Sequence, residues 1–190
     1  MLNRKTLAAI AAVLLLTAGL VGATSIGMKL SGPGAVNETT IKAGEPVTVD
    51  IYFENDVERR GFSVGFKITS PDIKTIVHPA DSGNGLNDNG DIKAHNGWQD
   101  NSVWDMGGLY VAERDWDGKL PELVGFGGIC IHKRFAPQKS TRQISFDLVV
   151  DEPGIFTIDS SYFPPTGTWM FAPPEHKPAW GGPYLFKVVE

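Results

Sequence analysis

Oxygen-bearing side chains that can ligate calcium gather in one glycine-containing segment, between positions 81 and 91. Asn87, Asn89 and Asp91 are spaced two residues apart, as calcium ligands in loops often are. Gly90 stands fourth in this run rather than sixth, and no glutamate lies twelve positions along, so the segment is not an EF-hand. It predicts either a weak structural calcium site at these three residues or a polar, turn-rich loop. We expect no other cofactor.

Two patterns are similar to parts of hydrolase active sites. Residues 61–65 read Gly-Phe-Ser-Val-Gly and match the G-x-S-x-G pattern, in which the serine occupies a sharp turn between a strand and a helix. Ser63 instead lies within an alternating strand, so we expect an outward-facing serine without a catalytic role. Asp115 and Asp117 are paired carboxylates, but a spacing of two residues does not set the separation that a glycosidase needs. Because the four histidines also lack ligand-type spacing, we expect a protein that is not an enzyme; they are His78, His95, His132 and His176.

The tryptophans are the strongest indication of a binding function. All five lie in polar or proline-bearing segments rather than in alternating strands. Flat aromatic faces stack on sugar rings and anchor protein interfaces, which makes each of them a candidate ligand-binding residue. The alternative is that they cap the open edges of the fold. The five are Trp98, Trp104, Trp116, Trp169 and Trp180.

Composition excludes several classes of protein. The chain has 190 residues, of which 42% are apolar and 21% charged, so it is long enough for one globular domain. Its net charge of −5 argues against a protein that coats nucleic acid. Cys130 is the only cysteine, so the domain has no internal disulfide and depends on its core for stability.

The N-terminal segment is typical of a secretory signal. Arg4 and Lys5 precede an apolar run over residues 7–16, and small residues follow up to Ala23. We expect residues 1–23 to be a signal peptide cleaved after Ala23, or else an uncleaved anchor. Cleavage removes two cations and no acid, so the remaining domain, residues 24–190, is more acidic than the whole chain. The expected location is secreted, periplasmic or cell surface, without membrane insertion after cleavage.

The domain is predicted to be all-β. In residues 47–54 and 62–69, apolar and polar residues alternate with a period of two, as in half-buried strands. The full set of expected strands is 25–30, 47–54, 62–69, 73–78, 123–131, 144–150, 155–158 and 184–190, with 103–106 as a ninth. Two long ordered loops cover residues 79–119 and 163–183. Since no helix is available for parallel crossovers, the pattern predicts a single antiparallel β-sandwich of jelly-roll or immunoglobulin-like type.

Two parts of the sequence resemble a cohesin domain. Residues 43–55 and 61–68 resemble its glycine-rich entry, its valine-rich strand and the aromatic strand that follows. Residues 142–150 and 154–158 resemble its last hairpin. The resemblance implies a cohesin-type β-sandwich in which one sheet face binds a dockerin. Contact residues do not carry over, because residues 81–117 and the proline-rich stretch depart from the family pattern.

These observations favour a secreted, non-catalytic binding module for protein–protein interaction or adhesion. Its expected partner is an extracellular protein or polysaccharide, and not nucleic acid. The alternatives are a carbohydrate-binding module that uses the loop tryptophans and a subunit of a surface layer or filament. A flat sheet face of mixed polar and apolar residues favours the first, and a coplanar row of exposed aromatics the second. A cleft that holds two convergent carboxylates, or serine with histidine, would favour a hydrolase.

Overall fold

The computed structural model describes residues 24–76, 93–95, 99–100, 107–114, 118–129, 136–162 and 168–190. The predicted signal peptide and the expected strand 103–106 lie outside these ranges. The described residues contain strands and no helix, and hence no helical segment long and apolar enough to span a bilayer. The strands are β1 (Ser25–Ser31), β2 (Ala35–Asn37), β3 (Thr40–Lys42), β4 (Val47–Asn55), β5 (Gly61–Thr69), β6 (Lys93–Ala94), β7 (Gln99–Asp100), β8 (Gly107–Arg114), β9 (Glu122–Ile129), β10 (Gln138–Leu148), β11 (Gly154–Ser160), β12 (Met170–Ala172), β13 (Ala179–Trp180) and β14 (Tyr184–Val189).

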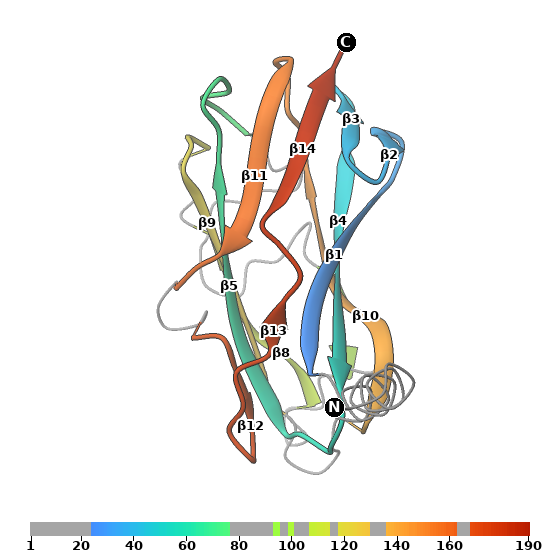
Figure 1. Ribbon diagram of the computed structural model, residues 1–190, viewed down its shortest axis with the longest axis vertical. Coiled ribbons are helices and arrows are strands. Elements are labelled where there is room, and N and C mark those ends of the chain that lie inside the picture. Colours follow the sequence, from blue (N-terminus) through green and yellow to red (C-terminus); the bar gives the residue numbers. More distant parts are fainter. Residues whose placement is uncertain are drawn as a thin grey trace, which may run out of the picture.

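The strands form two sheets packed face to face (Figure 1). One sheet has the order β13-β1-β4-β10-β6, and the other has the order β2-β3-β14-β11-β5-β9-β8-β7 with β12 also paired to β5. The predicted β-sandwich is confirmed. Most pairs are antiparallel, but β1 pairs in parallel with β13, and β3 with β14. The two short parallel pairs were not expected, and in each the chain reaches its parallel partner through the rest of the domain rather than through a crossover helix.

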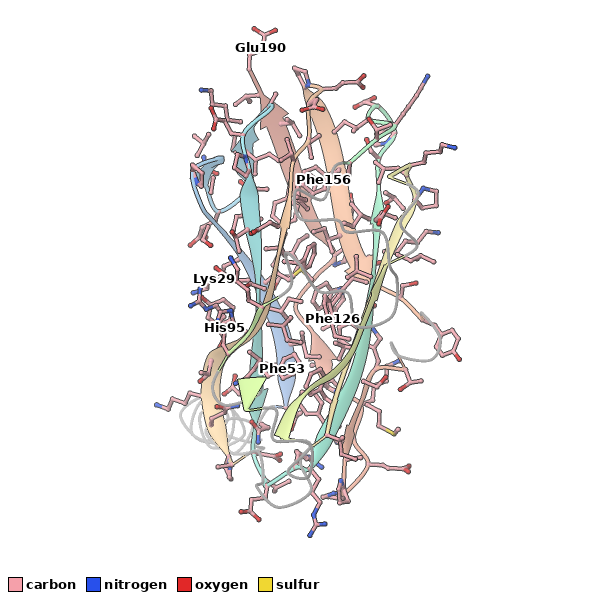
Figure 2. All side chains as sticks on the ribbon, turned by 180° about the vertical axis from the view of Figure 1, so that it is seen from behind. Lys29, Phe53, His95, Phe126, Phe156 and Glu190 are labelled. Carbon is pink, nitrogen blue, oxygen red and sulfur yellow. The ribbon has the colours of Figure 1, made fainter. Side chains whose placement is uncertain are left out.

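Alternation of side chains correctly identified the core of the two central strands. In β4, Val47, Val49, Ile51 and Phe53 have no exposed surface, and the apolar positions of β5 are buried opposite them. Figure 2 shows Phe53 between the two sheets, together with Phe126 and Phe156 from other strands. Because each strand carries one apolar face, the two sheets bury these faces against each other and leave polar residues outside.

Seven of the expected strands are present, with shifted ends, but the strand expected at residues 73–78 is not. Its described part, residues 73–76, makes only an isolated bridge between Thr75 and Lys119. The Ser70 hydroxyl accepts hydrogen bonds from the backbone N–H groups of Asp72 and Ile73, at 3.0 and 2.7 Å, and so holds the chain in a turn. Ile73 and Ile76 are thus buried as a cap on the core, without forming a ladder.

Both predicted long loops contain strands. The segment 79–119 holds β6, β7 and β8, and the segment 163–183 holds β12 and β13. The short strands β2 and β3 were not expected either. Strands of two or three residues are too short to show alternation, so their position depends on neighbouring strands rather than on their own sequence.

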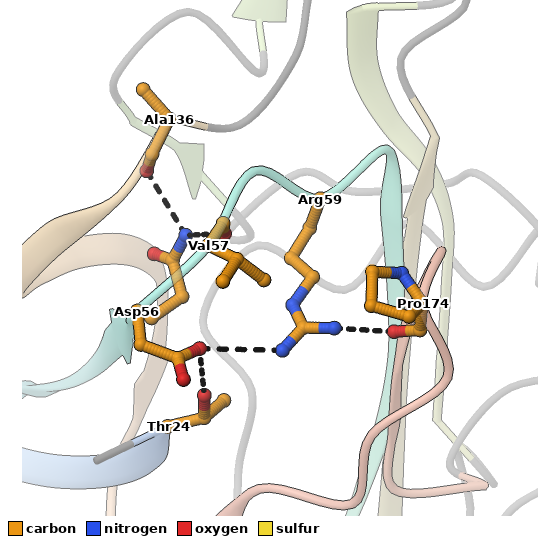
Figure 3. Close-up of polar contacts among 7 residues, drawn as sticks. Thr24, Asp56, Val57, Arg59, Ala136 and Pro174 are labelled. Carbon is orange, nitrogen blue, oxygen red and sulfur yellow. Dashed lines mark hydrogen bonds and ion pairs between the residues drawn. The ribbon is translucent and has the colours of Figure 1, made fainter. Parts of the chain in front are cut away.

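A buried arginine ties the β4–β5 turn to two distant segments (Figure 3). Arg59 is 3% exposed, and its guanidinium lies 3.3 Å from Asp56 and donates to the Pro174 carbonyl. The Thr24 hydroxyl donates to the same Asp56 carboxylate at 2.9 Å. That bond is the main cause that holds the pKa of Asp56 below its ordinary value of 3.8, and the Arg59 charge acts in the same direction. The cluster therefore fastens the start of β1 and the turn after β12 to one end of the sandwich.

Candidate functional site

The outer surface of β5, β11 and β14 is one candidate binding surface, named here the β11 face. Alternation along β11 buries Phe156 and Ile158 and leaves Ile155 38% exposed. The same alternation in β14 buries Phe186 and leaves Leu185 57% exposed. Large apolar side chains on an outer sheet face have no role in the core, so they are candidate contact residues.

The register of the strands makes this face a continuous mixed surface. Leu185 of β14 lies opposite Thr157 of β11, and Thr157 lies opposite Thr69 of β5. The next positions outward along the strands pair Ile155 with Lys187. Apolar, hydroxyl and charged side chains thus lie next to one another on this outer sheet face. A mixed surface of this kind is typical of protein–protein interfaces.

Two of the predicted ligand-binding tryptophans, Trp169 and Trp180, lie together at the side of the sandwich. Trp180 belongs to β13 in one sheet, while Trp169 precedes β12 in the other. Their ring centroids are 5.2 Å apart in a T-shaped contact, and each ring also packs against Phe66. Trp169 is 7% exposed and Trp180 is half-buried. They close the open edge between the sheets and do not form a coplanar row.

The Trp169 ring is held where the strand pairing along one edge of β5 is interrupted. Strand β11 pairs with β5 from Phe66 onward and β12 pairs with it up to Ser63, so neither strand pairs with Gly65. The Gly65 carbonyl accepts two other hydrogen bonds, from the Ser161 backbone N–H and from Nε1 of Trp169, each 2.8 Å long. An open pocket of about 550 Å³ lies beside this interruption, and both tryptophans line it.

The remaining predicted site residues lie outside the described residues. These are Trp98, Trp104 and Trp116 and the calcium candidates Asn87, Asn89 and Asp91. Within the described ranges, no three acidic, histidine or cysteine side chains converge as a metal site would require. The calcium site therefore remains a prediction from the sequence.

Ser63 has the environment expected of a strand residue. It lies within β5, opposite Gly127 of β9 and Met170 of β12, and the strand continues beyond it without a sharp turn. Its Oγ accepts a hydrogen bond from the Thr168 backbone N–H at 3.1 Å. This contact gives Ser63 a role in holding the start of β12, and among the described residues no histidine bonds to its hydroxyl to activate it.

A second serine, Ser145, does contact a histidine. His95 Nε2 lies 2.9 Å from Ser145 Oγ on the outer side of the five-stranded sheet, where Figure 2 labels His95. Ser145 is buried and lies opposite the buried Asp50. The Asp50 carboxylate accepts a hydrogen bond from Ser31 at 2.7 Å and pairs with Arg142 at 3.2 Å. Since that carboxylate is occupied by these partners and Ser145 is inaccessible, the group is a structural network rather than a catalytic triad.

His95 should make folding sensitive to mild acid. Partial burial lowers the pKa of its imidazole below the ordinary value of 6.5; the positive charge of Arg142 acts in the same direction, and Asp50 opposes it. The unfolded chain therefore takes up a proton at a higher pH than the folded chain does. Stability from this group is complete above about pH 6.5 and declines as the pH falls toward the folded-state pKa. Urea unfolding at about pH 7.5 and about pH 5 should show a smaller acid-induced loss for His95→Gln than for the unmodified chain.

An equal loss in both proteins would mean that His95 does not contribute to this pH dependence. Asp147, which lies 3.8 Å from Lys93 in the same sheet, provides a control. Asp147 is not among the charged groups that shift the pKa of His95, so Asp147→Asn should leave the difference between the His95 variant and the unmodified chain unchanged.

Comparison with known proteins gives a likeness of fold. The chain matches no protein-family model and no curated protein. Among solved structures, it is similar to a type II cohesin domain from the cellulosome of Acetivibrio cellulolyticus, with 17% identity, a TM-score of 0.56 and coverage of 86% of this chain and 95% of that one.

Two other cohesin structures align at similar coverage. The second type II cohesin module of an Acetivibrio cellulolyticus adaptor scaffoldin has 12% identity and a TM-score of 0.50, over 90% of this chain and 95% of that one. A cohesin module from a Clostridium perfringens family 33 glycoside hydrolase has 8% identity and a TM-score of 0.51, over 90% and 99%. Because these likenesses span nearly the whole of each module, the chain has the fold of a cohesin module.

Proposed function

We propose that this chain is a non-catalytic, exported module that binds a partner protein on its β11 face. The observation that carries the proposal is the exposure of Leu185 and Ile155 on an ordered sheet, next to charged residues such as Lys187. Interfaces combine a few buried apolar anchors with a polar surround, and this face provides both. The cohesin fold supports the proposal, because the resemblance implies that a sheet face is the binding surface.

The acidic and hydroxyl groups around the two apolar residues favour a partner of defined chemistry. Asp159 and Lys67 lie opposite each other on β11 and β5, at the end of the face nearest β13. A partner with an apolar anchor flanked by both signs of charge would match this arrangement. Partner binding by apolar contact also explains why Leu185 stands in the C-terminal strand where a polar residue would serve solubility better.

The test is capture of a partner by the full chain, purified as its host exports it and exposed to the extracellular fraction. A retained protein is identified by mass spectrometry, and its dissociation constant is then measured with purified components. Leu185→Asp and Ile155→Asp should each weaken binding at least about tenfold, because each places an unpaired charge in the desolvated centre of the interface.

Val57→Asp is the matched control. Val57 is 40% exposed, as Ile155 is, but it lies in the β4–β5 turn at the opposite end of the sandwich (Figure 1). It should leave the dissociation constant unchanged. Retention of no protein, or equal binding by the Leu185 variant, would contradict the proposal. Capture of the chain itself, lost on Leu185→Asp, would instead identify this face as a self-assembly surface and favour the filament alternative.

A further inference from the structure

The pocket beside Trp169 and Trp180 has the features of a small-ligand site separate from the β11 face. Its volume of about 550 Å³ lies within the range of about 300–1,000 Å³ that is typical of ligand pockets. The end of β11 and the segment after it form one wall, through Ser160, Ser161 and Tyr162. Residues before β12 and around β13 form the other walls, so three separate segments of the chain converge there.

The aromatic part of the pocket is rigid and its polar atoms are occupied. Trp169 Nε1 donates to the Gly65 carbonyl, and Trp180 Nε1 donates to Asp159 at 2.8 Å. Both indole N–H groups thus already have an acceptor in the protein, so the two tryptophans offer a ligand only the carbon atoms of their rings. Tyr162 adds a ring that is 62% exposed at the mouth of the pocket. These rings provide the flat apolar surface on which the carbon-bound hydrogens of a sugar pack.

Trp169 is held in a backbone conformation that disfavours its side chain. Its φ of 55° lies in the left-handed region, where bulky residues rarely occur. A residue with a Cβ is disfavoured in that conformation. Such strain persists where the surrounding structure or a binding role requires it, and Trp169 is one of the residues that line the pocket.

The polar part of the pocket is rich in hydroxyl groups. The side-chain hydroxyls of Ser160, Ser161, Tyr162 and Thr168 make no hydrogen bond to another residue in the part of the chain that the structure describes, and neither does the Lys177 ammonium. A hydroxyl both donates and accepts, as sugar hydroxyls do. A set of hydroxyls without partners among the described residues, beside aromatic carbon, therefore matches a polyhydroxylated ring better than a charged or purely apolar ligand.

We propose that this pocket binds a neutral glycan, with a sugar ring packed against Tyr162 and Trp180 and its hydroxyls bonded to the serine and threonine hydroxyls. Charge favours a neutral glycan over an acidic one. The protein carries a net charge of −5, which repels a polyanion, and Lys177 is the one cation among the described residues that line the pocket. The proposal is independent of partner binding on the β11 face, because the two surfaces use different residues.

The experiment titrates the full chain with the neutral hexasaccharides cellohexaose, xylohexaose, mannohexaose and maltohexaose, and with polygalacturonate as an acidic probe. Tryptophan fluorescence and calorimetry report binding. At least one neutral hexasaccharide should bind and polygalacturonate should not. Tyr162→Ala should weaken that binding about tenfold, since it removes a stacking ring. Lys177→Gln should weaken it by about threefold or less, because glutamine retains a donor.

The Tyr162 and Lys177 side chains are both exposed, so the two variants are expected to fold, which circular dichroism would verify. Leu185→Asp on the β11 face is the control and should leave glycan binding unchanged. Absence of binding by all four neutral probes would overturn the proposal. So would binding that Tyr162→Ala leaves intact, or preference for polygalacturonate, or displacement of the glycan by a proline-rich peptide, which would indicate an aromatic groove for extended peptides.

Discussion

Replacing Trp169 by alanine is expected to lower the free energy of unfolding by about 3–5 kcal/mol. The indole is 7% exposed, packs on Phe66 at 5.6 Å and on Trp180 at 5.2 Å between ring centroids, and donates to the Gly65 carbonyl. Alanine would leave a cavity at the edge of the sandwich and remove one of two donors to that carbonyl. Urea unfolding followed by circular dichroism measures the loss.

Glycine at the same position separates the contribution of the ring from that of the backbone. Alanine keeps the penalty of the left-handed φ, and glycine does not. Trp169→Gly should therefore be more stable than Trp169→Ala by up to about 1 kcal/mol, the reverse of the usual order of these residues in strands. If the glycine variant were the less stable of the two, the left-handed conformation would not be costly at this position.

Phe53→Ala is the second substitution with a large expected effect, again about 3–5 kcal/mol. Phe53 has no exposed surface and stands on β4, in the five-stranded sheet. Its ring lies 4.9 Å from that of Phe62 on β5 and 5.2 Å from that of Phe171 on β12, so it joins the two sheets and secures the short strand. Removing it should weaken both contacts at once.

Phe53→Leu provides the control, because leucine fills most of the same volume and should cost less than half as much. The alanine variant should also become easier to cleave by a protease near β12, because the contact between Phe53 and Phe171 is lost. Equal stability of the alanine and leucine variants would contradict this expectation, because it would show that the volume filled by the side chain at position 53 contributes little to stability.

The sequence predicted the central strands because their two faces differ. Val49 and Ile51 alternate with Thr48 and Asp50, and each apolar residue of the pair is buried as expected. The same rule does not separate the faces of β14, where Leu185 stands between the apolar residues Tyr184 and Phe186. Exposure of Leu185 follows from its pairing with Thr157, which depends on how distant strands align.

The candidate pocket was predicted only in part for a related reason. Trp169 and Trp180 were identified by residue type, and the alternative that tryptophans cap an open edge of the fold describes the burial of Trp169 against Phe66. Tyr162 and Lys177 were not identified at all. They carry no local pattern, and they meet only because β11 and β12 pair with successive parts of the same edge of β5.

The two parallel strand pairs have a mechanical consequence. In Figure 1, β1 begins at the lower end of the sandwich and β14 ends at the upper end, so tension applied at Ser25 and Val189 acts along the long axis. Under that tension β1 slides along β13, and β14 slides along β3. Hydrogen bonds between strands loaded in this way share the force and must break together, whereas a strand peeled from its end loses them one at a time. We expect the domain to resist stretching between its two ends more strongly than its thermal stability alone would suggest, as a link that bears load between two attached bodies must.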